Sequence, residues 1–268
     1  MTAVLDAPAL APRTVTLAHA TDFEGFRAAC RALWAAQVEP GRVDWHTADE
    51  TEGDLFASEP AAPFTATAND APPVHVPAAF GPLAQTVVLH ADPARFGLLY
   101  RLLWRLQVEP GLRRDALDAD WVRLSQMGQA VRRDMHKMKA FVRFRTVREA
   151  AREGEAIFAS AGSDALPSDD AFEDDDDAVP GPTFSGAAPG DWHVAWFEPE
   201  HHIVEAVAPF FVRRFTGMRW AILTPERSLH WDGQALSIGP GARRDQAPPA
   251  DAGEGLWLTY YRSIFNPA

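Results

Sequence analysis

Residues 191–233 combine short runs of aromatic and branched side chains with one helical pattern. We predict strands at 192–197, 218–223 and 229–231, with a helix at 200–215 between the first two. Such residues favour a pleated, half-buried surface, so the tryptophans in these strands are predicted to form sheet core. Stacking of unpaired bases on them is the less favoured reading. These tryptophans are Trp192, Trp196, Trp220 and Trp231.

Two local signals refine this stretch. Asp232-Gly233 is typical of a hairpin turn and joins 229–231 to a strand at 235–238. Pro209 lies inside the predicted helix, so we expect a kink or a break into two pieces there.

The clearest helix is predicted at 118–139, because apolar residues recur there in steps of three and four. A strand is predicted at 141–147, with Val142, Phe144 and Thr146 on one face and Arg143 and Arg145 on the other. Its pairing with the strand at 192–197 would form a hairpin interrupted by the segment between them.

The first half of the chain predicts a β-α-β unit. Strands are expected at 14–18 and 42–46, and Thr21-Asp22 is expected to cap the helix between them. A helix at 80–89 and another that has Pro93 as its first residue follow. We therefore predict a flexible N-terminus at 1–13, a β-α-β plus helical region at 14–110 and an α+β core at 111–268.

Charge is distributed unevenly along the chain, whose formal net charge is −12. Residues 151–191 contain eleven acidic residues and one basic residue, which predicts a disordered acidic insertion at 151–190. Residues 111–150 contain ten Lys or Arg and five Asp or Glu. Salt screens electrostatic interactions beyond about 8 Å, so a basic patch can act locally on an acidic protein if the acidic insertion swings away from it.

The basic residues of the predicted helix and strand could hold backbone phosphates, as could two arginines near the end of the helix at 200–215. The alternative is a solvated helix face whose basic residues form salt bridges with the acidic insertion. The candidate nucleic-acid-binding residues are Arg132, Arg133, Lys137, Lys139, Arg143, Arg145, Arg213 and Arg214.

A metal site is the weaker possibility. His193, His201, His202 and Glu205 lie near one another in sequence, and His201 and Glu205 would share a helix face. Three or more converging ligands are needed, so we expect no metal and no cofactor.

One cysteine, Cys30, excludes a disulfide within the chain. Without a secretion signal or a transmembrane-length apolar run, we expect a cytoplasmic protein that does not contact a membrane.

Several short sequence segments together resemble a known family. They are 90–93 with 99–104, 134–145, 196–201, 219–225 and 260–267, which include Asp134-Met-His-Lys-Met-Lys and Trp196-Phe-Glu-Pro-Glu-His. This set resembles domain-of-unknown-function family 4130, which is associated with DNA metabolism. Its members occur fused to a uracil-DNA-glycosylase-like domain or encoded beside a radical-SAM protein. The insertion at 151–191 is longer than the family usually carries, and no glycosylase motif is visible in the chain.

The residues and the resemblance together predict an α+β fold: an antiparallel sheet packed by helices, preceded by a β-α-β and helical region. The expected function is that of a DNA metabolism or repair accessory protein that binds DNA through its basic helix and strand. Its expected partner is a uracil-DNA-glycosylase-like domain or a radical-SAM protein. No catalytic motif was found. An enzyme of unrecognised, possibly metal-dependent chemistry and a protein-interaction scaffold remain the alternatives.

Overall fold

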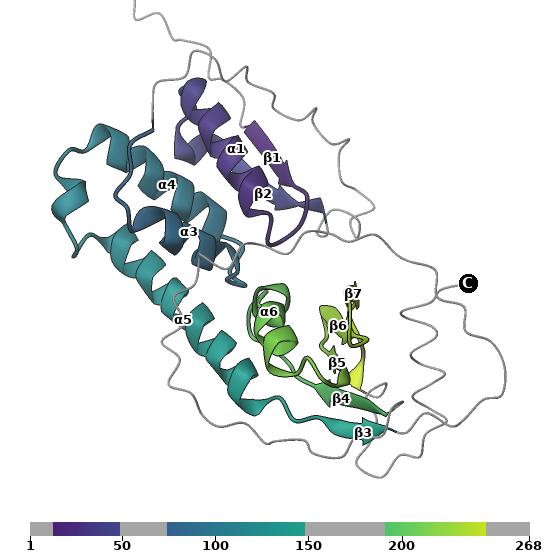
Figure 1. Ribbon diagram of the computed structural model, residues 1–268. Coiled ribbons are helices and arrows are strands. Elements are labelled where there is room, and N and C mark those ends of the chain that lie inside the picture. The colour runs from purple at the N-terminus through teal and green to yellow at the C-terminus, as the bar shows by residue number, and fades with distance from the viewer. Residues whose placement is uncertain (1–12, 49–73, 148–190, 245–268) are drawn as a thin grey trace, which may run out of the picture. The chain divides into compact units, whose positions relative to one another are not determined.

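The computed structural model describes residues 13–48, 74–147 and 191–244 (Figure 1). The chain divides into two compact units, residues 1–131 and 132–268, and the division falls inside one long helix. The predicted domain boundaries stay predictions. The acidic insertion at 151–190 and all of the N-terminal segment except Arg13 lie outside the described residues.

The first unit begins with the predicted β-α-β arrangement. Strands β1 (Arg13–Leu17) and β2 (Val43–Thr47) pair in parallel, and α1 (Phe23–Ala35) connects them. Asp22 caps the helix, because its Oδ1 accepts a hydrogen bond from the backbone N–H of Gly25 at 2.8 Å. The predicted capping residue is thereby confirmed.

Three helices complete the core of this unit: α3 (Phe80–Val88), α4 (Arg95–Val108) and the first part of α5 (Ala119–Phe141). Two short 3₁₀ turns also belong to this unit: η1 (Pro40–Arg42) lies between α1 and β2, and η3 (Leu112–Arg114) lies between α4 and α5. The predicted start of α4 at Pro93 is wrong, since residues 93 and 94 form a turn. Asp92 Oδ1 accepts a hydrogen bond from the N–H of Ala94 at 2.9 Å and shapes that turn.

The second unit contains a five-stranded sheet. Its strands are β3 (Arg145–Val147), β4 (Trp192–Trp196), β5 (Arg219–Leu223), β6 (Arg227–Trp231) and β7 (Leu236–Pro240), in that spatial order. Neighbours pair antiparallel except β4 and β5, which pair in parallel because α6 (Val204–Arg214) connects them. The sheet is thus mostly antiparallel, and the α+β prediction is confirmed.

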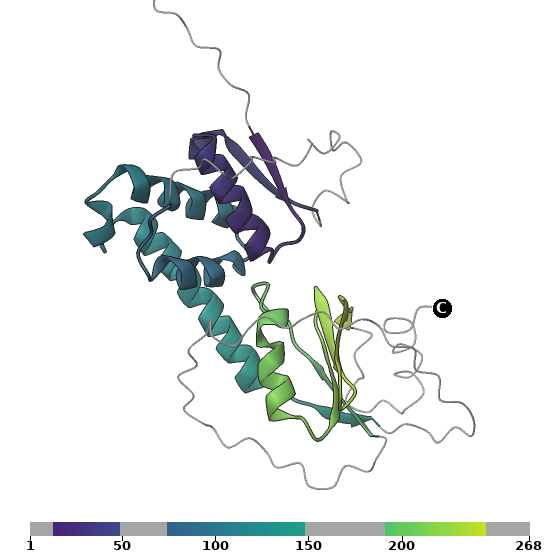
Figure 2. The ribbon, with the colours of Figure 1, turned by 45° about the horizontal axis from the view of Figure 1, so that its top comes forward.

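Helix α6 packs on one face of this sheet (Figures 1 and 2). The ring of Phe211 lies 6.1 Å from that of Trp220, which is fully buried in β5. Beyond β6, the backbone turns at Gly233, whose φ of 100° lies in the left-handed region. The predicted hairpin between β6 and β7 is confirmed.

Two elements differ in length from their predicted residue ranges. Helix α6 begins at Val204 rather than at residue 200, and it continues through Pro209 as one helix without the break that was considered. The strand predicted at 141–147 is shorter: Phe141 is the last residue of α5, and β3 starts at Arg145. Among the described helices, none has the length and apolar character needed to cross a bilayer.

Candidate nucleic-acid interface

The basic side of α5 follows from the pattern that fixes the helix. Val131 and Met138 are fully buried at 0% exposure, in the apolar stripe that the sequence predicts. Arg132 and Arg133 are therefore directed to solvent, and both side chains are exposed. Neither makes a hydrogen bond or an ion pair with any part of the chain that the structure describes.

Lys137 lies one helical turn after Arg133 and has a carboxylate partner. Its Nζ is 2.7 Å from Oε1 of Glu200, and both side chains are exposed. The hydrogen bond between them raises the pKa of Lys137 and lowers the pKa of Glu200. Both groups are charged at neutral pH, so Glu200 offsets this one lysine.

Aromatic contacts bring the ends of α5 and α6 together. The Lys139 Nζ lies 5.1 Å from the ring centroid of Phe210 in α6. Just beyond α5, the ring of Phe144 lies 5.1 Å from that of Phe215. The ends of both helices are therefore neighbours within the second unit.

Arg213 and Arg214 occupy the last turn of α6 and are exposed. They directly precede Phe215, so the contact between Phe144 and Phe215 brings their backbone near that of Arg143 and Arg145. Basic residues at a helix C-terminus interact favourably with the helix dipole, which accounts for part of their placement.

Arg143 and Arg145 are both exposed. The Nη1 of Arg143 donates hydrogen bonds to the carbonyl oxygens of Ala140, at 2.6 Å, and Val142, at 3.1 Å. This guanidinium thus caps carbonyl groups at the end of α5. The cap accounts for the late start of β3, since residues 142–144 leave the helix in an irregular conformation instead of a strand.

The structure thus places all eight predicted residues in the second unit. Lys139 is partly buried and the other seven are exposed. Phe144, Phe210 and Phe215 connect those near the ends of α5 and α6, whereas Arg132 and Arg133 lie about two turns earlier along α5. Arg132, Arg133, Arg143 and Arg214 form no ion pair among the described residues.

Asp134 has a structural role that was not predicted from the sequence. Its side chain is buried at 1% exposure, and Oδ2 accepts hydrogen bonds from the N–H groups of Glu200 and His201. Burial raises the pKa of this carboxyl group, although the two N–H groups act in the opposite direction. The sequence signal for this role is an acidic residue within the apolar stripe of α5.

The proposed histidine set does not converge. His201 precedes α6, so it does not share a helix face with Glu205 as predicted. His202 Nδ1 lies 2.7 Å from Oε1 of Glu226, and His193 is buried in β4, where burial lowers its pKa. Within residues 13–48, 74–147 and 191–244, no group of three or more His, Cys, Asp or Glu could hold a metal ion.

The strand tryptophans are mainly core residues. Trp192, Trp220 and Trp231 are buried, as predicted, and Trp196 is partly buried. The Trp192 ring lies between two cationic or titratable groups: the Arg219 guanidinium is 4.1 Å from its centroid, and the His230 ring stacks on it at 4.5 Å. These contacts leave little of the ring for stacking against a base.

A comparison with protein families finds a match to one family model over residues 93–165 and 183–268, more than half of the chain. No curated protein and no solved structure matches the chain. The matched residues include all of α4 and α5, and the sheet with α6. The chain therefore belongs to DUF4130, a family defined by a domain of unknown function.

Proposed function

We propose that this protein binds nucleic acid through the basic surface of its second unit and acts as an accessory in DNA metabolism or repair. The resemblance described above supplies the biological setting, with a uracil-DNA-glycosylase-like domain or a radical-SAM protein as partner. The chain's own contribution would be to hold the phosphate backbone while the partner performs chemistry.

The observation that supports the proposal is the set of exposed arginines without carboxylate partners. Arg132, Arg133, Arg143 and Arg214 are exposed and form no ion pair among the described residues. An arginine paired with a carboxylate would have to give up that partner to bind a phosphate. These four have no carboxylate to give up, and Arg143, whose Nη1 donates to two backbone carbonyls, would offer its remaining N–H groups. A planar guanidinium also matches phosphate geometry with two parallel hydrogen bonds.

The arrangement favours backbone contact over base recognition. The residues come from the side of α5 and from the ends of α5 and α6, and neighbouring tryptophans of the sheet are buried. Lys and Arg that neutralise phosphates give sequence-independent affinity that decreases with salt. We therefore expect similar affinities for unrelated sequences.

A matched pair of double variants tests the proposal. Arg132→Gln/Arg133→Gln removes two adjacent charges from α5, and Arg113→Gln/Arg114→Gln removes two adjacent exposed charges from η3 in the other unit. Binding of single- and double-stranded oligonucleotides is measured by fluorescence anisotropy from 50 to 200 mM salt.

We expect the α5 variant to bind about tenfold more weakly or worse at low salt. The slope of log K against log salt should fall by up to about 2, because up to two phosphate contacts are lost. The η3 variant should bind like the wild-type protein. Equal losses in both variants would contradict the assignment of this surface, and no salt-dependent binding by the wild type would favour a protein-interaction scaffold.

A further inference from the structure

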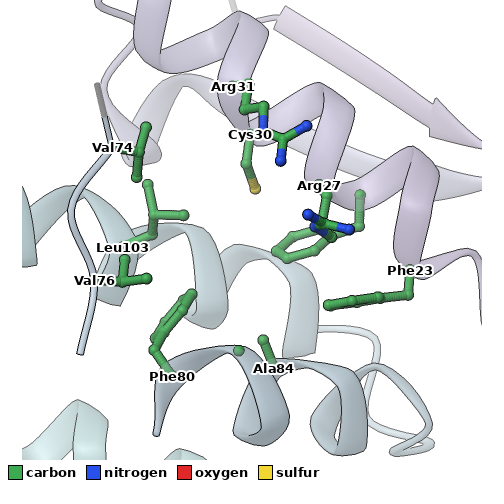
Figure 3. Close-up of a pocket in the computed structure, with 11 residues that line it drawn as sticks. Phe23, Arg27, Cys30, Arg31, Val74, Val76, Phe80, Ala84 and Leu103 are labelled. Atoms are coloured by element: carbon green, nitrogen blue, oxygen red, sulfur yellow. The ribbon is translucent and has the colours of Figure 1, made fainter. Parts of the chain in front are cut away.

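A second feature of the molecule is an apolar pocket in the first unit, separate from the basic residues of the second. It lies between α1, the segment at 74–76 and α3, and its volume is about 250 Å³ (Figure 3). Its walls include the rings of Phe23 and Phe80 and the side chains of Val74 and Val76. Val76 is 38% exposed although it is a large apolar residue.

Two arginines on consecutive turns of α1 line this apolar space. Arg27 and Arg31 are four residues apart and so lie on the same side of the helix, and both are exposed. Arg27 pairs with Glu24 at 2.8 Å, and its guanidinium lies 5.7 Å from the Phe23 ring centroid. Arg31 has no ion pair with any residue in the described part of the chain.

Cys30 contributes its sulfur to the wall between these arginines (Figure 3). Burial raises the pKa of its thiol well above the usual value, so the group is neutral at physiological pH. The thiol therefore adds no negative charge that would repel an anion held by Arg27 or Arg31. Among the described residues that line the pocket, none has a carboxylate side chain.

We propose that this pocket binds a compact amphiphile, with its apolar body between Phe23 and Phe80 and its anionic carboxylate or phosphate head on Arg31. Charge complementarity selects the head, because Arg31 offers a guanidinium that forms no ion pair among the described residues. The apolar lining selects the body, since polar atoms placed there would lose hydrogen bonds to water without replacement.

Pocket size limits the ligand. A volume of about 250 Å³ corresponds to roughly eight water molecules, which suggests a body and head of about ten non-hydrogen atoms. Octanoate has this size. An extrahelical base is a poorer fit, because the side chains that line the pocket offer few groups for the hydrogen-bonding edge of a base.

Matched ligands and variants test the proposal by isothermal titration calorimetry. Octanoate and octyl phosphate carry the anionic head, and 1-octanol presents the same body without a charge. Arg31→Gln removes the unpaired cation, with Arg114→Gln as control. Gly81→Leu adds a side chain at a residue that lines the pocket, where a Cβ would meet no atom within 4 Å, and Gly111→Leu is its control at an equally open position.

We expect submillimolar binding of octanoate or octyl phosphate and at least tenfold weaker binding of 1-octanol. Arg31→Gln should weaken binding of the anions at least fivefold, and Gly81→Leu at least tenfold, while both controls bind like the wild type.

Three results would overturn the proposal: absence of binding by both anions, equal binding of octanoate and 1-octanol, or unchanged binding in Gly81→Leu. Displacement of octanoate by an oligothymidylate would also overturn it, because the pocket would then hold nucleic acid. Since the pocket and the basic surface use different residues, the result of this experiment is independent of the nucleic-acid proposal.

Discussion

Asp134 Oδ2 accepts two backbone hydrogen bonds, from the N–H of Glu200 at 2.8 Å and from that of His201 at 3.0 Å. The two partners are 66 and 67 residues away along the sequence. The carboxylate holds the turn that leads from β4 into α6. It thereby connects two of the sequence segments on which the family resemblance rests, 134–145 and 196–201. The late start of α6 at Val204 follows from this contact.

Asp134→Ala should destabilise the protein by about 2–3 kcal/mol at pH 7, because two N–H groups lose a charged acceptor. Asp134→Asn keeps one acceptor oxygen and should cost less, about 1 kcal/mol. Urea unfolding followed by circular dichroism measures both. Asp44→Ala, at an exposed position in β2, is the control and should change stability by less than about 0.5 kcal/mol. An Asp134→Ala variant as stable as this control would contradict the role of the carboxylate.

The difference in stability between the wild type and Asp134→Asn should depend on pH. Burial raises the pKa of Asp134, so the folded state favours the protonated form. This contribution to stability is present below the unfolded pKa and is lost as pH rises through the folded pKa. Asn does not titrate, so the cost of Asp134→Asn should be smaller at pH 7 than at pH 4. A cost that grows between these two values would show that the sign of the shift is wrong.

Arg105 is the centre of an ion-pair network at the start of α5. Its guanidinium nitrogens lie 2.8 Å from carboxylate oxygens of Asp118 and Asp120 and 2.9 Å from one of Glu109. The hydrogen bond from Arg105 lowers the pKa of Asp118. For Asp120, burial acts to raise the pKa, but hydrogen bonds from Arg101 and Arg105 outweigh burial and lower it.

Arg105→Gln should therefore cost about 2–3 kcal/mol at pH 7, since it leaves two largely buried carboxylates short of a partner. A lowered carboxyl pKa contributes stability above the unfolded pKa, which is lost as pH falls through the folded pKa. The cost of the substitution should thus shrink when unfolding is measured at pH 3. Arg114→Gln serves as the control, and an equal cost at both pH values would contradict the linkage.

The elements predicted well from sequence are those fixed by local patterns. Helix α5 follows from its apolar stripe, and the hairpin follows from Asp232-Gly233. The start of α6 depends on the contact with Asp134, which is remote in sequence. The irregular conformation of residues 142–144 depends on the cap by Arg143, a contact set by its structural context. The apolar pocket could not be predicted, because its walls come from segments that are remote in sequence.

Gly233 provides a test of the hairpin. Its φ of 100° disfavours any side chain, and a Cβ there would meet no atom within 4 Å, so the cost of Gly233→Ala comes from the backbone alone. We expect about 1–2 kcal/mol of destabilisation in thermal or urea unfolding. Gly111→Ala, at an open position with φ of −72°, should be neutral or slightly stabilising. Equal stability of the two variants would contradict the left-handed turn.

Glu200 offers a test of the basic surface in which binding should become stronger. Glu200→Gln removes the partner of Lys137 and makes its ammonium available to a phosphate. The pair is exposed, so the stability measured by urea unfolding should stay close to that of the wild type. Oligonucleotide affinity should rise about two- to fivefold at 50 mM salt, with a salt slope steeper by up to about 1.

Glu24→Gln is the matched control, because it makes the same change in net charge and releases Arg27 from an exposed pair in the other unit. An equal rise in both variants would mean that net charge alone controls affinity, and no rise in Glu200→Gln would exclude Lys137 from the interface.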